Sequence, residues 1–174
     1  MDTHLQILSG RYRGRKFAVP AGARPTQNMA RTAVFNILTP LAPFETAWDA
    51  FAGSGILGAE CISRDWVKLC LFSDIESETV CDNVRGMPGA NVMNRDALKM
   101  IQSMAPGTGL VFVDPPYDQP QLGQKFVDEF NENASDGAVV VWEMENSFVP
   151  KIPDMTVVAD KAYGRARFLI LQKK

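Results

Sequence analysis

Histidine is nearly absent from this sequence, cysteine is scarce, and long apolar runs are missing. His4 is the one histidine among 174 residues, which argues against Ser–His or Cys–His catalysis and against a histidine-rich metal site. Cys61, Cys70 and Cys81 are odd in number and lack C-x-x-C spacing, so reduced thiols are expected. No apolar run approaches the ~18 residues of a spanning helix, and no secretory leader opens the chain. These absences predict a cytoplasmic protein with neither a membrane span nor a metal.

Alternating strands and helices predict a single α/β domain. With 46% hydrophobic residues, one domain of this length buries roughly 70% of its unfolded surface. Strand–helix alternation favours a mainly parallel sheet with helices on both faces and ligands at the carboxyl ends of the strands. A basic extension (1–44) is expected to precede the main unit (45–174). We expect a hairpin at 5–8 and 16–19, a helix at 26–38, and strands at 46–51, 68–73, 90–94, 109–113, 137–142, 156–162 and 166–172.

The tetrapeptide Asp114-Pro115-Pro116-Tyr117 directly follows the apolar run 110–113. The two prolines end the strand because neither can donate a backbone N–H. A carboxylate, carbonyl groups and an aromatic ring therefore remain at the strand's carboxyl end. This set suits a planar amino group, since Asp114 and the Pro115 carbonyl can accept its two hydrogens while Tyr117 stacks on the ring behind. The alternative is an ordinary turn with a surface tyrosine.

A glycine-rich turn follows the first strand of the main unit. Gly53, Gly55 and Gly58 have the G-x-G-x-x-G spacing, and Asp74 follows the next predicted strand. Glycines in such a turn allow a tight bend and let a ligand approach the backbone, as in nucleotide-binding βαβ units. The spacing alone is a weak signal, and it does not identify the nucleotide.

Asp49, at the mouth of that first strand, favours one ligand class. A dinucleotide places an anionic pyrophosphate over the turn, where a carboxylate would repel it. S-adenosylmethionine has no phosphate and carries an ammonium and a sulfonium, both cationic. We therefore predict S-adenosylmethionine rather than NAD at this turn.

Asp74 and Asp96 each follow a predicted strand. Asp74 is expected to accept hydrogen bonds from ribose hydroxyls, and Asp96 from the adenine amino group. The alternative is that each is the N-cap of the helix that follows it. Because the glycine turn, Asp74, Asp96 and Asp114 all follow strands of one parallel sheet, we expect them to converge at one edge.

Basic residues are concentrated in the first 44 positions. Six basic side chains and one acidic residue give this segment a charge of +5, so the remainder carries −7 within the total of −2. A basic cluster beside Tyr12 predicts an arm that contacts nucleic-acid phosphates. The alternative is a solvated hairpin whose charges only aid solubility. The six basic residues are Arg11, Arg13, Arg15, Lys16, Arg24 and Arg31.

Taken together, several motifs resemble the RsmD family, bacterial methyltransferases that modify guanine N2 in 16S rRNA. The resemblance runs from about Leu5 to the end of the chain. Its motifs are Gly10-Arg11-Tyr12-Arg13-Gly14-Arg15-Lys16, Arg24-Pro25-Thr26, Arg31 with Phe35-Asn36-Ile37-Leu38, the Asp49–Gly55 loop, Asp114–Tyr117 and Tyr163-Gly164.

The resemblance implies a Rossmann-like class I methyltransferase with a seven-stranded sheet, an N-terminal hairpin and a helix extension. It implies catalysis at Asp114–Tyr117 and RNA contacts from the six basic residues above. The implied donor-binding residues are Asp49, Ala52, Gly53, Ser54, Gly55, Asp74, Ile75, Asp96 and Ala97.

The chain departs from the family pattern in two places. The family usually has R-P-T-T-D-x-V-R-E, whereas Asn28 and Thr32 are neutral at the two acidic positions of that pattern. The family loop is usually D-L-F-A-G-S-G, in which Ala50 replaces the leucine.

The sequence therefore predicts an enzyme, acting as a monomer, that uses S-adenosylmethionine to methylate an exocyclic base amino group in 16S rRNA or the small ribosomal subunit. Adenine N6 in DNA suits the same tetrapeptide, and a non-catalytic RNA-binding or assembly factor that retains the fold is the alternative from another class. Glutamine-amide methylation is disfavoured, because that related pattern begins with Asn where this chain has Asp114. A dehydrogenase is disfavoured by Asp49 and by the missing substrate histidine.

Overall fold

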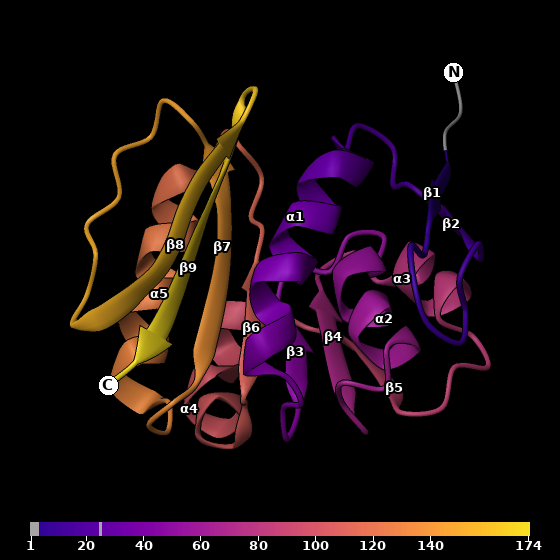
Figure 1. Cartoon of the computed structure of the whole chain (residues 1–174), viewed down its shortest axis with the longest axis horizontal. Coiled ribbons are helices and arrows are strands. Elements are labelled where there is room, and N and C mark those ends of the chain that lie inside the picture. The colour runs from indigo at the N-terminus through magenta and orange to yellow at the C-terminus, as the bar shows by residue number, and fades with distance from the viewer. Residues whose placement is uncertain (1–3, 25) are drawn as a thin grey trace.

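A central seven-stranded sheet organises the molecule (Figure 1). The computed structural model describes residues 4–24 and 26–174, so Pro25 of the Arg24-Pro25-Thr26 motif lies outside the described residues. The strand order is β5-β4-β3-β6-β7-β9-β8. The strands are β3 (Ala47–Asp49), β4 (Cys70–Asp74), β5 (Ala90–Asn94), β6 (Leu110–Val113), β7 (Val139–Glu145), β8 (Met155–Tyr163) and β9 (Ala166–Lys173).

The strand directions confirm the predicted, mainly parallel sheet. β3 pairs in parallel with both β4 and β6, β4 with β5, and β6 with β7, whereas β9 runs antiparallel to β7 and β8. From β3 the chain moves outward through β4 and β5 and then returns to the other side of β3. Ligands of open α/β sheets bind in the crevice at such a reversal.

Helices cover both faces of the sheet, as expected (Figure 1). Alternate residues of each buried strand enter opposite cores: Leu110 and Phe112 of β6 belong to one, and Val111 and Val113 to the other. This alternation follows from the two-residue period of a strand. The first core includes α1 (Asn28–Leu38), α2 (Ile56–Ser63) and α3 (Glu78–Asn83), and the second includes α4 (Ile101–Met104) and α5 (Pro120–Asn133).

The expected N-terminal hairpin is present as β1 (His4–Gln6) and β2 (Lys16–Ala18), which pair antiparallel. Its turn lies directly on the end of α2. Gly10 has a φ of 86°, and a Cβ added there would lie 1.8 Å from the Ser63 carbonyl oxygen. Tyr12 donates its backbone N–H to Ser63 Oγ at 2.9 Å. Glycine is therefore required at position 10 for the hairpin to reach α2.

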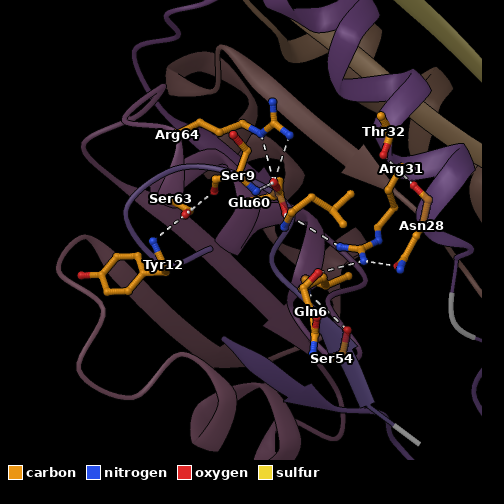
Figure 2. Close-up of polar contacts among 12 residues, drawn as sticks. Gln6, Ser9, Tyr12, Asn28, Arg31, Thr32, Ser54, Glu60, Ser63 and Arg64 are labelled. Carbon is orange, nitrogen blue, oxygen red and sulfur yellow. Dashed lines mark hydrogen bonds and ion pairs between the residues drawn. The ribbon is translucent and has the colours of Figure 1, made fainter. Parts of the chain in front are cut away.

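Glu60, a fully buried residue of α2, anchors the hairpin (Figure 2). Its carboxylate accepts the backbone N–H groups of Leu8 and Ser9, each at 2.9 Å. Arg64 lies 3.0 Å from one carboxylate oxygen, and Arg31 of α1 lies 3.8 Å from the other. A buried carboxylate needs such partners, because an unpaired charge in the interior is very costly.

The prediction that Arg31 contacts RNA is wrong. Its side chain is fully buried between α1 and α2, where it donates to the Gln6 carbonyl at 2.9 Å and to Asn28 Oδ1 at 2.7 Å. Burial lowers the pKa of Arg31, and the charge of Glu60 opposes that shift. Arg31 therefore joins the helix extension to the hairpin and cannot reach a nucleic acid.

Two helices differ from their expected bounds. α1 begins at Asn28 rather than at Thr26, because the Thr26 hydroxyl is turned toward a side chain of β7 instead of capping the helix. The helix expected after Asp96 begins as a 3-10 turn, Ala97–Met100, which is followed by the short α4. In the part of the chain that the structure describes, no helix has the length and apolarity needed to cross a bilayer.

We expect Asn28→Asp to stabilise the protein by about 1.5 kcal/mol. A carboxylate at this position would turn the hydrogen bond from buried Arg31 into an ion pair and would also complement the N-terminus of α1, whose first turn has no acidic residue. Gln27→Glu is the matched control, because it adds a charge at the same helix end. That control should gain about 0.5 kcal/mol. Urea unfolding measures both, and equal gains would contradict a specific effect of the Arg31 contact.

Candidate active site

Three predicted carboxylates lie at adjacent strand ends. Asp49 ends β3, Asp74 ends β4, and Asp114 directly follows β6. Because β3 pairs with both β4 and β6, these carboxyl ends share one edge of the sheet. Asp96 follows β5, which is the next strand beyond β4. The structure thus brings the expected residues to one edge of the sheet.

The glycine turn is held by two of these carboxylates. Gly53 donates its backbone N–H to Asp74 Oδ2 at 2.8 Å, and Gly58 donates to Asp49 Oδ2 at 3.0 Å. Gly53 and Gly55 have φ values of 54° and 79°, which favour glycine. A Cβ added at Gly53 would meet no atom within 4 Å, so the turn is open to a ligand there.

Ala52 and Ser54 form the buried underside of the turn. Ala52 donates its N–H to the Ser73 carbonyl at 3.0 Å. Asn83 of α3 donates to the Ser54 carbonyl at 2.8 Å and also bonds both backbone groups of Ala18 in β2. One asparagine therefore connects the glycine turn to the hairpin. Asn83 was missed by the sequence analysis, because it lies inside a predicted helix with no motif around it.

The four residues expected around adenosine differ in exposure and in their hydrogen bonds. Ile75 is 73% exposed and offers an apolar surface beside Asp74. Asp74 is not a helix N-cap, since Ser77 has that position before α3. Asp96 is the N-cap of the following 3-10 turn and accepts the N–H of Leu98 at 3.0 Å. Ala97 is buried. The N-cap alternative is therefore confirmed for Asp96 and wrong for Asp74.

Glu143 of β7, which the sequence analysis missed, lies beneath the proline turn. Its side chain is buried and accepts hydrogen bonds from the Tyr117 hydroxyl at 3.0 Å and from Thr26 Oγ1 at 2.8 Å. The guanidinium carbon of Arg24 lies 6.0 Å from the centre of the Tyr117 ring. A shallow pocket is lined by the turn and by β7, including Pro115, Pro116, Tyr117, Trp142 and Glu143.

This edge of the sheet gathers carboxyl groups that have no basic partner. No ion pair of the described residues includes Asp49, Asp114 or Glu143. Burial raises the pKa of Asp49 to about 7, an effect that the Gly58 N–H opposes. Burial, followed by the charges of Glu143 and Asp49, raises the pKa of Asp114 well above its usual range. Burial also raises the pKa of Glu143, and its bonds to Thr26 and Tyr117 oppose that shift.

These features fit a cationic ligand with an adenosine group. A positive charge beside Asp49 would favour the ionised form of its buried carboxyl group. The open face of Gly53 admits a ligand against the backbone, and Ile75 offers a flat apolar contact. Among the described residues, no group of three or more His, Cys, Asp or Glu side chains is placed to hold a metal ion.

Most of the remaining basic residues of the N-terminal segment are exposed. Arg13, Lys16 and Arg24 are exposed, and Arg11 is exposed with Asp65 at 3.3 Å. Arg15 is different, because its guanidinium donates to the backbone carbonyls of Asn83 and Arg85, each at 2.7 Å. Arg15 therefore fixes the hairpin to the end of α3 while remaining half-buried.

Comparison with known proteins gives consistent matches over nearly the whole chain. A family model described as Conserved hypothetical protein 95 matches residues 5–172. Ribosomal RNA small subunit methyltransferase D of Escherichia coli (strain K12) is 29% identical and covers 98% of this chain and 90% of its own length. Putative rRNA methyltransferase YlbH of Bacillus subtilis (strain 168) is 29% identical, with coverage of 98% and 100%. The solved structure of the putative methyltransferase yhhF from Escherichia coli is 27% identical, covers 98% of each chain and superposes with a TM-score of 0.84.

We expect Gly55→Ala to destabilise the protein by about 3 kcal/mol. The left-handed φ costs an L-residue roughly 1–2 kcal/mol, and the added Cβ would lie 2.6 Å from Val80 Cγ2 in the packed core. Gly53→Ala is the control, because it has a positive φ and open space. It should cost only about 1 kcal/mol. Urea unfolding compares the two, and equal losses would show that contact with Val80 is unimportant.

Proposed function

The chain belongs to the family described as Conserved hypothetical protein 95, and we propose that it uses S-adenosylmethionine to methylate guanine N2 in the 16S rRNA of the small ribosomal subunit. The observation that carries the proposal is the position of the Asp114–Tyr117 turn beside the acidic glycine turn, since β3 and β6 are paired neighbours. The proposed base-binding group and the proposed cation-binding group therefore lie at neighbouring strand ends. The names of the curated relatives support rRNA as the polymer.

The donor would be held by the residues of the glycine turn and of the adjacent strand ends. Asp49 would attract the positively charged methionine end, and the backbone of Ala52–Gly55 would lie against it. Asp74 would accept the ribose hydroxyls, exchanging its bond to Gly53 for them. Ile75 and Ala97 would contact adenine, while Asp96 has one oxygen engaged by Leu98 and the other for the adenine amino group. When bound, S-adenosylmethionine supplies an electrophilic methyl group on a sulfonium.

The proline turn would hold and activate the target base. Leaving the stack costs the base a few kcal/mol, and stacking on Tyr117 returns roughly 1–3 kcal/mol of it. Asp114 and the Pro115 carbonyl accept the two amino hydrogens, with Pro116 keeping the turn rigid. These bonds strengthen as the nitrogen gains positive charge, so they favour the transition state over the ground state. Asp114 accepts the proton that the methylated nitrogen loses.

The proposed RNA contacts are the exposed basic residues of the N-terminal segment. Arg11, Arg13 and Lys16 lie on the hairpin, and Arg24 lies next to Tyr117. Arg15, bound to carbonyls of α3, would contribute mainly by holding the hairpin. This arm would dock on the phosphates of a structured RNA and thereby bring the base to the crevice.

The function is tested by methyl transfer from labelled S-adenosylmethionine to naked 16S rRNA, to assembled small subunits and to DNA. We expect label at guanine N2 of 16S rRNA in one or both ribosomal substrates and none in DNA. Mapping the modified nucleotide identifies the atom. Label in DNA adenine, or the absence of transfer together with the absence of donor binding in calorimetry, would overturn the proposal.

Asp114→Asn should lower the rate of methyl transfer by about 10²–10⁴-fold, because the amide cannot accept the proton. Donor affinity should change little, since Asp114 faces the base. Asp118→Asn is the matched control, as it removes an exposed carboxylate four residues further along the same turn. Single-turnover transfer and calorimetry with S-adenosylmethionine measure the two effects. Full activity of Asp114→Asn would remove this residue from the mechanism.

Arg13→Ala and Lys16→Ala should each weaken RNA binding and reduce the slope of log affinity against log salt by about one. Lys125→Ala is the control, because Lys125 is an exposed lysine of α5 on the opposite side of the sheet. Filter binding over a range of salt concentrations gives the slopes. Equal slopes for all three variants would place the RNA elsewhere.

A further inference from the structure

Glu143 is an unusual residue for its place in the fold. It lies within β7, a strand buried almost along its whole length, and pairs with Phe168 of β9. Only 4% of its surface is exposed. A carboxyl group in such a position is costly unless hydrogen bonds satisfy it. Both carboxyl oxygens of Glu143 accept a hydroxyl, one from Tyr117 and the other from Thr26.

These two hydroxyls come from segments that are distant in sequence. Tyr117 belongs to the proline turn, whereas Thr26 lies between Arg24 of the basic arm and the start of α1. Glu143 therefore connects the N-terminal basic segment to the proline turn. The hydrogen bond to the phenol also limits rotation of the Tyr117 ring, because a ring fixed at its hydroxyl has few remaining orientations.

Glu143 also lies beside Asp114, because β6 and β7 pair in parallel with Val113 opposite Trp142, and these two residues directly precede Asp114 and Glu143. Apart from burial, the negative charge of Glu143 is the largest influence that raises the pKa of Asp114, ahead of the charge of Asp49. The charged and titratable groups around the pair are Asp49 from β3, Tyr117 from the turn and Arg24 from the arm. Burial and the Glu143 charge raise the pKa of Tyr117, so its hydroxyl stays protonated and remains a donor.

We propose that Glu143 is a positioning residue of the methyl-transfer site, which orients the Tyr117 ring for the base and places a negative charge beside Asp114. The inference rests on the proposed function, because it assumes that Tyr117 stacks on the base and that Asp114 receives its proton. A neutral side chain of the same shape would keep the packing but lose the charge. Tyr117→Phe would keep the ring but lose the bond.

The effect on Asp114 is measured in the free protein, without RNA or donor. Asp114 is followed by NMR titration of ¹³C-labelled aspartate carboxyls, with Asp114→Asn used to assign its signal. In Glu143→Gln the titration midpoint of Asp114 should fall by about one pH unit or more, because the neighbouring negative charge is gone. Glu145→Gln is the matched control. It removes a carboxylate two residues along the same strand that is paired with Arg165 instead, and it should move the midpoint little.

The same shift should appear in catalysis. Activity requires ionised Asp114, so the transfer rate of the parent protein falls as pH drops through the pKa of Asp114. Because Glu143→Gln lowers that pKa, the acidic limb of its kcat/KM profile should move to lower pH by the amount seen in the NMR titration. An unmoved limb, with transfer intact, would overturn the electrostatic part of the proposal.

The orienting role is measured at a pH on the plateau of the profile. Glu143→Leu, which removes the acceptor, and Tyr117→Phe, which removes the donor, should each lower kcat/KM for the RNA by about tenfold, and the double variant by about tenfold rather than a hundredfold, because both remove the same hydrogen bond. Donor affinity should match the parent protein in each variant, which separates an effect on the base from a loss of the fold. Multiplying effects would show that Glu143 does not act through Tyr117.

The two proposals fail in distinguishable ways. If the parent protein transfers no methyl group to rRNA, small subunits or DNA, the proposed function fails, and with it the catalytic meaning of Glu143. The NMR titration then still decides whether Glu143 controls the proton affinity of Asp114. If transfer to rRNA occurs while the Asp114 midpoint and the double-variant coupling are both unchanged, only the inference about Glu143 fails.

Discussion

The pairing of β3 with β4 on one side and β6 on the other determines the chemistry of this protein. It places three carboxylates, Asp49, Asp74 and Asp114, at neighbouring strand ends. Such a cluster is unfavourable on its own, because burial and mutual repulsion both disfavour ionisation. The raised pKa values of Asp49 and Asp114 result from this free-energy cost of ionisation. A cationic ligand would offset part of that cost, because a positive charge beside Asp49 favours the ionised carboxylate.

The basic hairpin is not an independent appendage. Glu60 holds its turn on α2, whose preceding residue is Gly55 of the glycine turn, and Asn83 bonds both β2 and Ser54. Buried ion pairs stabilise little by themselves, but removing one partner leaves an uncompensated charge. The Glu60–Arg31 pair thus fixes where the hairpin lies relative to the glycine turn. In this chain Asn28 accepts a hydrogen bond from Arg31 without adding charge, so Glu60 is the acidic partner that the structure gives Arg31.

The sequence was sufficient where a short motif determines both conformation and chemistry. Two prolines end β6, and glycines with positive φ form the turn after β3, so the sheet and the groups at its edge could be predicted. Side-chain contacts between residues that are distant in the sequence could not be predicted. β7 was expected to end at Trp142, because a glutamate interrupts its apolar run, and Glu143 was therefore overlooked. Tertiary pairing with β9 extends the strand past it. Arg31 was misplaced for the opposite reason, since a count of charges does not reveal which arginine is buried.

Under the proposed function, the uneven charge of the chain determines which part of the RNA can enter the site. The arm attracts phosphates, whereas the acidic crevice repels them, so an RNA backbone that docks on the hairpin is kept out of the site. Only a base that has left its stack can enter, because its flat surface is uncharged and its amino group donates to acceptors. Arg24, above the Tyr117 ring, lies where the basic N-terminal segment meets the acidic strand ends. The hydrogen bond from Thr26 to Glu143 fixes the position of this basic segment relative to the proline turn. A single buried carboxylate therefore positions both the segment proposed to bind phosphate and the ring proposed to receive the base.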